Sequence, residues 1–329
     1  VRIGLATGPV VVGEASRKDN TEAKLAVGEA PNLAARLLGL AGPDEVVIAP
    51  ATRRLVGDVF ALTDLGAHRL KGIAELVPVW RVDAMRRMEG RFDAAHAGMR
   101  LTTLVGREEE LALLLRRWRQ ACDGDGQVVS ICGEAGIGKS RLCHVLRERL
   151  AEPHTALRHQ CSPYHLNSAL HPFIEQLEFA AGFARDDTPE QRLDKIEAVL
   201  VGSAEQTAES APLLAALLSL PTERYPSLNL SPQRQKEKTL EALAGQLEAL
   251  AHRRPVLMMF EDLHWVDPTS RELLDALVPK LHGLRVLLVT THRPEYAAPW
   301  AGQRGVTSVT LSRLERGNVA QLVGEVTGG

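Results

Sequence analysis

Residues 133–140 read Gly-Glu-Ala-Gly-Ile-Gly-Lys-Ser, and this octapeptide constrains the fold more than any other part of the 329-residue sequence. It matches the phosphate-binding pattern G-x-x-x-x-G-K-[ST], the Walker A motif, at every fixed position. Glycines lack a Cβ, so the loop backbone can take positive φ and bring its N–H groups against an anion. The pattern predicts that Lys139 reaches the β- and γ-phosphates of a nucleotide and that Ser140 ligates Mg²⁺.

The sequence around the loop supplies the structural context that this motif requires. A short apolar, β-branched run, Gln127–Cys132, precedes it and is typical of a buried strand. After it, apolar residues recur at helical spacing through Leu150. The alternative is a glycine-rich turn that matches by chance, and the strand–loop–helix order favours the phosphate loop. The predicted nucleotide-binding residues of the loop are Gly133, Glu134, Ala135, Gly136, Ile137, Gly138, Lys139 and Ser140.

Composition limits the remaining possibilities. Hydrophobic residues make up 45% and charged residues 24% of the sequence, which is ordinary for a soluble globular protein. A net charge of −2 does not support a nucleic-acid or membrane-surface footprint. No apolar run approaches the roughly 18 residues of a spanning helix, no signal peptide opens the chain, and the four cysteines lack metal-ligand spacing. We therefore expect a cytoplasmic protein. The ends look cut, which suggests a fragment of a longer protein.

The chain divides into three predicted parts: a first domain at 1–83, a linker at 84–101, and a second domain at 102–329. In the first domain the runs Val1–Ala6 and Pro9–Val12, separated by Thr7-Gly8, predict a hairpin. The other predicted elements there are helices at Pro31–Leu40 and Pro50–Val56 and strands at Val46–Ala49, Phe60–Leu65 and Val77–Val82.

In the second domain, strand-like runs alternate with helical stretches, which predicts an α/β fold with a parallel sheet flanked by helices on both faces. The predicted strands are Gln127–Cys132, Val256–Glu261, Val286–Thr290 and Val306–Leu311. One predicted helix ends at Cys122. The others span Leu170–Ala181, Pro189–Val201, Ala211–Ser219, Pro232–Ala251 and Ser270–Leu281. The polar, Pro- and Ser-rich residues 202–231 are interpreted as a loop region.

Two adjacent carboxylates follow a second buried strand. Glu261 and Asp262 come directly after Val256–Phe260. A Mg-nucleotide site needs one carboxylate for the metal and its water shell and can use another to polarise the attacking water. Both residues are predicted to be catalytic and metal-binding. Their order is the reverse of that in many P-loop ATPases, and which one faces the metal stays open. The alternative is a solvated acidic helix start.

A third buried strand ends in polar residues. Thr290, Thr291 and Arg293 follow Val286–Val289, at the carboxyl edge where open α/β sheets bind ligands. Thr291 and Arg293 are predicted nucleotide contacts, and Arg293 could register charge at the γ-phosphate as an arginine finger does. The alternative is a strand end with an exposed arginine.

Four segments together resemble the signal-transduction ATPases with numerous domains (STAND), within the AAA-like P-loop class. They are Leu104-Val-Gly-Arg-Glu108, Gly133–Ser140, Glu261-Asp-Leu-His-Trp-Val-Asp267 and Thr290-Thr-His-Arg293. The resemblance covers roughly residues 102–329. It implies a nucleotide-operated switch in which ATP binding closes the domain and permits oligomerisation, while hydrolysis is slow.

In the first domain, Asn32 and Arg36 are four residues apart and share one helix face. Such a pair can hydrogen-bond a ribose and stabilise charge on a phosphorus centre, although at this spacing it is more often a solvated surface feature. The pattern around it resembles the C-terminal half of a class III adenylate/guanylate cyclase catalytic domain, with a partial ferredoxin-like α+β fold. The matching segments are Arg2–Gly13, Asn32–Leu37, Leu65-Gly, Leu70-Lys-Gly72 and Pro78-Val79.

This second resemblance implies that Asn32 orients the ribose and Arg36 stabilises the α-phosphate during 3′-hydroxyl attack. The parent would then be a phosphorus–oxygen lyase that forms cyclic AMP or cyclic GMP, working as a head-to-tail homodimer. Two departures limit the prediction. The family's two metal-binding aspartates belong to segments upstream of Val1, and Leu25 stands where the family often has a polar purine-reading residue. Adenine and guanine therefore cannot be told apart.

The sequence as a whole predicts an ATP- and Mg²⁺-binding signalling protein, in which half a cyclase domain precedes a regulatory ATPase. The expected partners are a nucleoside triphosphate, a homodimer mate through the cyclase domain and an ATP-dependent oligomer, with no membrane and no direct nucleic-acid contact. Two alternatives remain. One is a non-catalytic switch whose degenerate cyclase module serves dimerisation, and the other is a DNA-binding transcription regulator.

Overall fold

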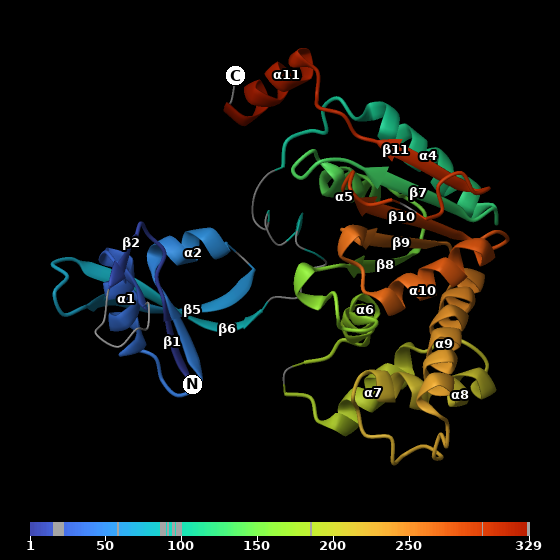
Figure 1. The fold of residues 1–329 in the computed structure, drawn as a ribbon, viewed down its shortest axis with the longest axis horizontal. Coiled ribbons are helices and arrows are strands. Elements are labelled where there is room, and N and C mark those ends of the chain that lie inside the picture. The colour runs from blue at the N-terminus through green and yellow to red at the C-terminus, as the bar shows by residue number, and fades with distance from the viewer. Residues whose placement is uncertain are drawn as a thin grey trace. The chain divides into compact units, whose positions relative to one another are not determined.

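The structure is a computed structural model that describes residues 1–15, 23–57, 59–85, 90, 92–93, 96, 101–184, 186–297 and 299–327. The chain forms two compact units, Val1–Leu101 and Thr102–Gly329, each with its own sheet (Figure 1). No helix among these residues is long and apolar enough to cross a membrane. Most residues of the predicted linker 84–101 lie outside the described ranges, although the last strand of the first unit continues to Met85.

In its described residues, the first unit contains a mixed four-stranded sheet, the helices α1 and α2 and a separate two-stranded ribbon. The sheet has the order β1-β4-β6-β5, with β1 and β4 parallel and the remaining pairs antiparallel. Its core gathers Leu37, Val47, Leu70 and Val79. The elements are β1 (Arg2–Leu5), β2 (Val11–Ala15), β3 (Ala23–Val27), α1 (Glu29–Leu38), β4 (Glu45–Ile48), α2 (Pro50–Val56), β5 (Phe60–Arg69) and β6 (Leu76–Met85).

The predicted hairpin between the first two strands is wrong. β1 pairs with β4 in parallel, and β2 pairs with β3 instead. The reason lies in Gly4, where a Cβ would meet the backbone oxygen of Ala34 at 2.4 Å and the backbone nitrogen of Leu38 at 2.5 Å. Because Gly4 lets α1 lie directly on β1, the chain passes from β1 through α1 to β4 as a crossover. β5 and β6 both run longer than predicted.

The second unit is built on a five-stranded sheet whose strands are all parallel. Its order is β11-β7-β10-β9-β8. The strands are β7 (Gln127–Cys132), β8 (Thr155–Gln160), β9 (Val256–Glu261), β10 (Val286–His292) and β11 (Val306–Thr310). β10 therefore lies between the strand that leads into the glycine loop and the strand that leads into the acidic pair. Because the strands are parallel, all three carboxyl ends meet at one edge of the sheet.

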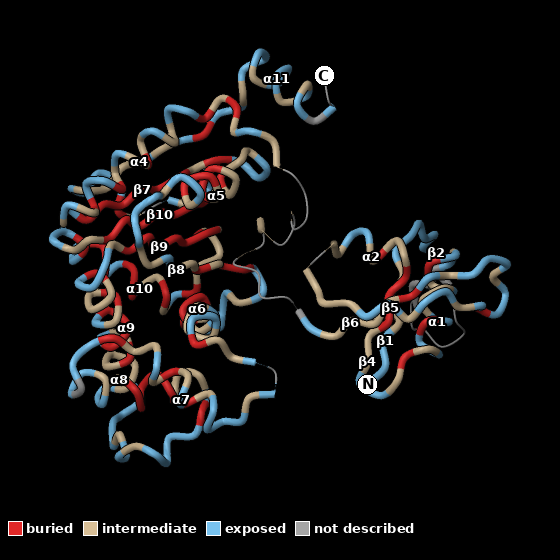
Figure 2. The backbone as a smooth tube through the Cα atoms, turned by 180° about the vertical axis from the view of Figure 1, so that it is seen from behind, coloured by how far each residue is buried: buried red, intermediate tan, exposed pale blue. Residues whose placement is uncertain are grey.

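Helices cover both faces of this sheet, as predicted. One face packs Val129, Ile131 and Met259 against α4 (Glu108–Cys122) and α5 (Lys139–Arg149). The other packs Met258 and Phe260 against α6 (His171–Ala181), α9 (Pro232–Arg253) and α10 (Pro268–Leu277). Alternate residues of each strand thus face opposite layers, and the three central strands are buried along their length (Figure 2).

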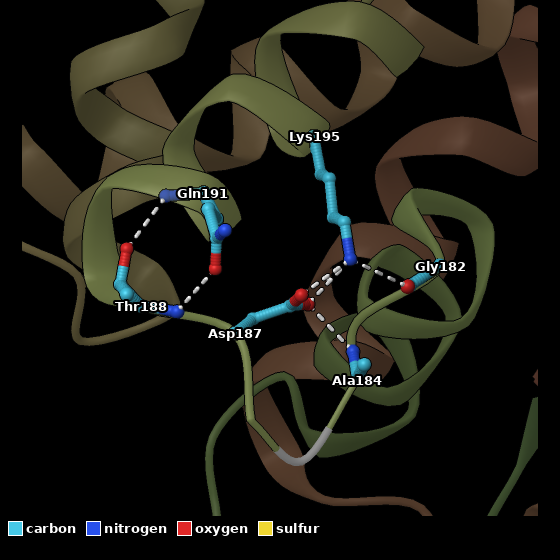
Figure 3. Close-up of polar contacts among 6 residues, drawn as sticks. All are labelled: Gly182, Ala184, Asp187, Thr188, Gln191 and Lys195. Atoms are coloured by element: carbon cyan, nitrogen blue, oxygen red, sulfur yellow. Dashed lines mark hydrogen bonds and ion pairs between the residues drawn. The ribbon is translucent and has the colours of Figure 1, made fainter.

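A helical extension leaves the sheet after α6. It consists of α7 (Pro189–Val199) and α8 (Ala204–Leu217), which share a small core with the end of α6. The turn into α7 is fixed by Lys195, whose Nζ donates to both carboxylate oxygens of Asp187 at 2.6 Å and to Gly182 O at 3.2 Å (Figure 3). Thr188 and Gln191 close a capping box at the helix start (Figure 3).

Several boundaries differ from the predicted ones. α8 begins at Ala204, ahead of the predicted helix Ala211–Ser219, and so takes in part of the segment interpreted as a loop, because Ser203 and Gln206 form a capping box that starts it and Pro212 is tolerated inside it. Strand β8 was missed. The remaining labelled elements are the 3-10 turns η1 (Pro163–His165), η2 (Leu263–Trp265) and η3 (Val278–Lys280) and the helix α11 (Arg316–Thr327). The predicted helix at Ser270–Leu281 is divided between α10 and η3.

Two glycines of the second unit allow a matched test of its packing. A Cβ on Gly126 would meet Leu281 O at 2.0 Å, whereas Gly245, exposed in α9, has nothing within 4 Å. Gly126→Ala should lower the free energy of unfolding by about 1–3 kcal/mol through overpacking. Gly245→Ala should raise it by roughly 0.5–1 kcal/mol through helix propensity. Urea unfolding of both variants checks this, and equal effects would contradict the packing described.

Candidate functional site

The glycine loop begins directly after β7 and ends in the first turn of α5. Gly136 has φ +76° and Gly138 has φ +104°, with nothing within 4 Å of a built Cβ at either position. The left-handed backbone, not crowding, therefore requires glycine at these two positions. Gly133 differs, because a Cβ there would meet the Ile137 side chain at 2.8 Å. The loop thus curls tightly before α5, whose first N–H groups have no partner within the helix.

Lys139 turns back into this curl. Its Nζ donates to Gly133 O at 2.7 Å and to Glu134 O at 2.9 Å, and the side chain is buried. Burial lowers the pKa of this ammonium, while the nearby Asp262 charge opposes the shift. An ammonium held over a cradle of N–H groups fits a polyphosphate chain, since the lysine supplies a positive charge and the loop supplies donors.

Arg107 donates a hydrogen bond to the glycine loop. No role was predicted for it from the sequence. It lies just before α4, is 6% exposed, and donates through Nη2 to Ile137 O at 3.4 Å and to Ser312 O. Its Nη1 donates to Glu110 at 3.0 Å. One guanidinium therefore joins the glycine loop to the segment that follows β11. The segment Leu104–Glu108 of the STAND resemblance contains this arginine, but its hydrogen-bond partners are too distant in the chain to be inferred from the sequence.

The two adjacent acids point to different neighbours. Glu261, the last residue of β9, is 1% exposed and accepts from Arg158 of β8, with Nε at 2.7 Å. Asp262 follows with φ +58°, and its N–H donates to Thr291 Oγ1 at 3.0 Å. The Asp262 charge opposes the lowering of the Lys139 pKa, so this acid lies within electrostatic range of the loop lysine.

The end of β10 supplies the third part of the site. Thr290 donates through Oγ1 to Ser130 Oγ of β7 at 3.1 Å, and His292 Nε2 lies 3.1 Å from the same hydroxyl. Thr291 serves as the acceptor for Asp262. Arg293 lies over the Trp265 ring, with Cζ 5.1 Å from the centroid, and its charge contributes to lowering the pKa of Lys139. Arg293 therefore faces the loop lysine closely enough to act on it.

The turn after the acidic pair carries two further polar residues. His264 lies in η2 beside Trp265, with ring centroids 4.3 Å apart, and burial lowers its pKa. Within the described part of the chain, neither of its ring nitrogens has a hydrogen-bond partner. Asp267 is 1% exposed, and its Oδ1 accepts from the backbone N–H groups of Thr269, Ser270 and Leu170. Asp267 thus caps α10 and fixes the segment that leads into α6.

The arrangement fits a magnesium ion bound together with phosphate and not a metal cage made by the protein alone. Among the described residues, no three His, Cys, Asp or Glu side chains form a possible metal cluster. Mg²⁺ typically takes one or two protein ligands and completes its shell with phosphate and water oxygens. Asp262 and Ser140 offer such a limited set beside the phosphate cradle, whereas Glu261 is already engaged by Arg158.

The structure therefore brings the glycine loop, Asp262, Thr291 and Arg293 to one edge of one sheet. Asn32 and Arg36 lie in the other unit, on the exposed side of α1 and one helical turn apart. Leu25 lies in β3 opposite Gly13 of β2.

Residues 103–289 match the family model described as the AAA ATPase domain, which is more than half of the chain, and the chain belongs to this family. It is 35% identical over 317 residues to an uncharacterised protein of Rhizobium meliloti (strain 1021). That alignment covers 96% of this chain and 30% of the relative, so the chain spans less than a third of the relative's length.

Solved structures with local similarity fall into two groups. The adenylyl cyclase CyaB from P. aeruginosa is 31% identical, with a TM-score of 0.25 over 26% of this chain and 43% of its own. CDC6P from Pyrobaculum aerophilum is 14% identical, with a TM-score of 0.40 over 72% of this chain and 54% of its own. The ORC1 protein of Aeropyrum pernix, solved in complex with DNA, is 14% identical, with a TM-score of 0.38 over 69% and 50%.

The three hydrogen bonds to Asp267 give a testable consequence. Asp267→Ala should lower the free energy of unfolding by about 2–3 kcal/mol, because a cap and a charged acceptor are lost together. Asp267→Asn retains an oxygen at the same place and should cost less than about 1 kcal/mol, since Asn caps helices as well as Asp does. Thermal or urea unfolding measures both, and equal losses would contradict the assignment of the carboxylate oxygen as the cap.

Proposed function

We propose that this chain is a nucleotide-operated switch that binds Mg·ATP at Gly133–Ser140 and hydrolyses it slowly. The observation that carries the proposal is the position of Lys139, held over the curled loop with the charges of Asp262 and Arg293 acting on it. Membership of the AAA ATPase domain family supports the same conclusion. The resemblance of residues 102–329 to the signal-transduction ATPases favours a regulatory role, with ATP-dependent oligomerisation.

Each residue of the site has a defined role in this proposal. The loop N–H groups and Lys139 bind the phosphates, and Ser140 and Asp262 would hold Mg²⁺, which neutralises phosphate charge when it is bound. Arg293 responds to the γ-phosphate from the end of β10, and Thr291 keeps Asp262 in place through its N–H. Asp262 also orients the attacking water. Glu261, predicted to be catalytic alongside it, serves this site through its ion pair with Arg158.

For the first unit we propose the C-terminal half of a class III nucleotide cyclase domain. The motifs Arg2–Gly13 and Asn32–Leu37 support this, as does the exposure of Asn32 and Arg36 on one face of α1. Asn32 would orient the ribose and Arg36 would stabilise the α-phosphate, in a site shared between two copies. The parent protein would convert ATP to cyclic AMP and diphosphate, with the AAA ATPase domain as its regulator.

A non-catalytic switch is the second candidate function. In this case ATP is sensed without turnover, and the first unit serves only for dimerisation. Leu25 in place of a polar purine-reading residue favours it, and so does the engagement of Glu261 by Arg158. Phosphate release from the wild type and from the Glu261→Gln and Asp262→Asn variants distinguishes the slow ATPase from the non-catalytic switch. Only a switch without turnover releases no phosphate from any of the three proteins. A DNA-binding regulator remains an alternative for the parent and draws no support from the net charge of −2.

Replacing Lys139 tests the nucleotide site. Lys139→Ala should reduce ATP affinity at least roughly 100-fold, because the charged donor to the phosphates is removed. Isothermal titration calorimetry with Mg·ATP measures this. Lys280→Ala is the control, since Lys280 is exposed and lies before β10, at the amino end of the strands. Unchanged affinity of the Lys139 variant would refute the assignment.

The cyclase proposal has its own test. The 329-residue chain should form no cyclic nucleotide from ATP or GTP with Mg²⁺ or Mn²⁺, because Asn32 and Arg36 contact substrate but no metal-binding aspartates of that family are matched in residues 1–83. Chromatography of the reaction products checks this. Cyclic nucleotide produced by this chain and lost in Asn32→Ala would show that the residues present suffice.

A further inference from the structure

Outside the glycine loop, a buried ion pair joins the neighbouring strands β8 and β9. Arg158 of β8 donates through Nε to Glu261 Oε1 at 2.7 Å, and its Nη2 contacts the same oxygen. The side chains are 10% and 2% exposed. Burying a charged carboxylate costs free energy unless a charged partner or several donors compensate it. The Arg158 guanidinium provides both charge and two donors to Glu261.

The sheet register explains how the two residues meet. Arg158 is registered with Met259, and Gln160 with Glu261, across the parallel pair β8 and β9. Registered residues of neighbouring strands share a face, and Met259 faces α4 and α5. The Arg158 side chain therefore runs along that face toward the carboxyl edge and reaches Glu261 diagonally. Its own backbone N–H donates to Gln176 Oε1 of α6 at 2.8 Å, which anchors this edge strand.

Glu261 lies close to the start of α5 as well. Its charge contributes, after burial, to raising the pKa of the Cys143 thiol in that helix, while the charges of Arg158 and Lys139 act in the opposite direction. Without Arg158, Glu261 would be an uncompensated buried acid one residue from Asp262, and its charge would still act on Cys143 of the helix that begins with Lys139.

We propose that Arg158 is a positioning residue that holds Glu261 along the α5 face of the sheet, so that Asp262 alone presents its carboxylate to the Mg-nucleotide. This inference rests on the proposed nucleotide site. Under this proposal the adjacent acids Glu261 and Asp262 have different roles. Glu261 joins β9 to β8 beneath the site, and Asp262 faces the site itself.

The test is the Mg²⁺ dependence of ATP binding, measured as the Mg²⁺ concentration at half-maximal binding in calorimetric titrations. Asp262→Asn should raise this midpoint about 10-fold or more, as expected for loss of a metal-directed carboxylate. Glu261→Gln should leave it within about twofold of the wild type, since Gln retains an oxygen acceptor for Arg158. A shift confined to the Glu261 variant would overturn the proposal.

A double-mutant cycle isolates the contribution of Arg158. Arg158→Met releases Glu261 and should lower the Mg²⁺ midpoint by roughly three- to tenfold, because a second carboxylate then acts at the site. In the Glu261→Gln background the same substitution should have no effect on the midpoint. Arg158→Lys keeps the charge and should remain close to the wild type. A midpoint shift that persists without Glu261 would mean that Arg158 acts by another route and would refute the positioning role.

The melting temperature of the nucleotide-free variants provides a second readout. Arg158→Met should melt well below the wild type, because it leaves a buried charge unpaired, and the neutral pair Arg158→Met with Glu261→Gln should recover most of the loss. If Arg158→Met does not fold, the comparison of Glu261→Gln with Asp262→Asn still decides the proposal. Absence of Mg·ATP binding by the wild type would refute the nucleotide site itself, whereas normal wild-type binding with the wrong variant pattern would refute only the role of Arg158.

Discussion

The parallel packing of β7, β10 and β9 is the constraint on which the candidate site depends. These strands are buried on both faces, so the polar groups at their carboxyl ends need hydrogen-bond partners at that edge. Inside the sheet, Thr290 and His292 both contact the Ser130 hydroxyl. Beyond the sheet, the partners come from the glycine loop, Asp262 and Arg293. A change of strand order would separate these groups even if every local motif were retained.

Electrostatics at this edge follows from how each charge is paired. Arg158 compensates Glu261 within the interior, while Lys139 donates to two loop carbonyls. Arg293 lies over the Trp265 ring and 3.9 Å from a carboxylate oxygen of Glu295, and both contacts are weaker than the buried ion pair. Arg293 is therefore held less firmly than Arg158. This difference would suit the proposed switch, in which Arg293 responds to phosphate charge.

The sequence predicted the parts of this fold that local physics determines. Apolar β-branched runs mark β7, β9 and β10, and the glycine pattern identifies the loop between β7 and α5. Strand β8 was missed because Thr-Ala-Leu-Arg-His-Gln carries its polar residues for specific partners, Glu261 and Pro172 O among them. Those partners are distant in sequence, and Glu261 is 103 residues from Arg158. The hairpin expected at the start of the chain failed for a related reason, since the contact of Gly4 with α1 is visible only once the helix is placed.

The two units also differ in what their burial implies. In the second unit the fold itself positions the buried or half-buried residues predicted for function, which are Gly133, Ile137, Gly138, Lys139, Ser140, Glu261, Asp262, Thr291 and Arg293, whereas residues 134–136 of the loop are exposed. In the first unit Asn32 and Arg36 are exposed on α1, and the geometry of a shared site would have to come from a second surface. The proposed nucleotide site lies within one unit, whereas the proposed cyclase pair would need a partner surface, and the two would make different demands on assembly. The coupling that a regulatory ATPase requires would follow if oligomerisation at the first kind of site controlled the meeting of surfaces at the second.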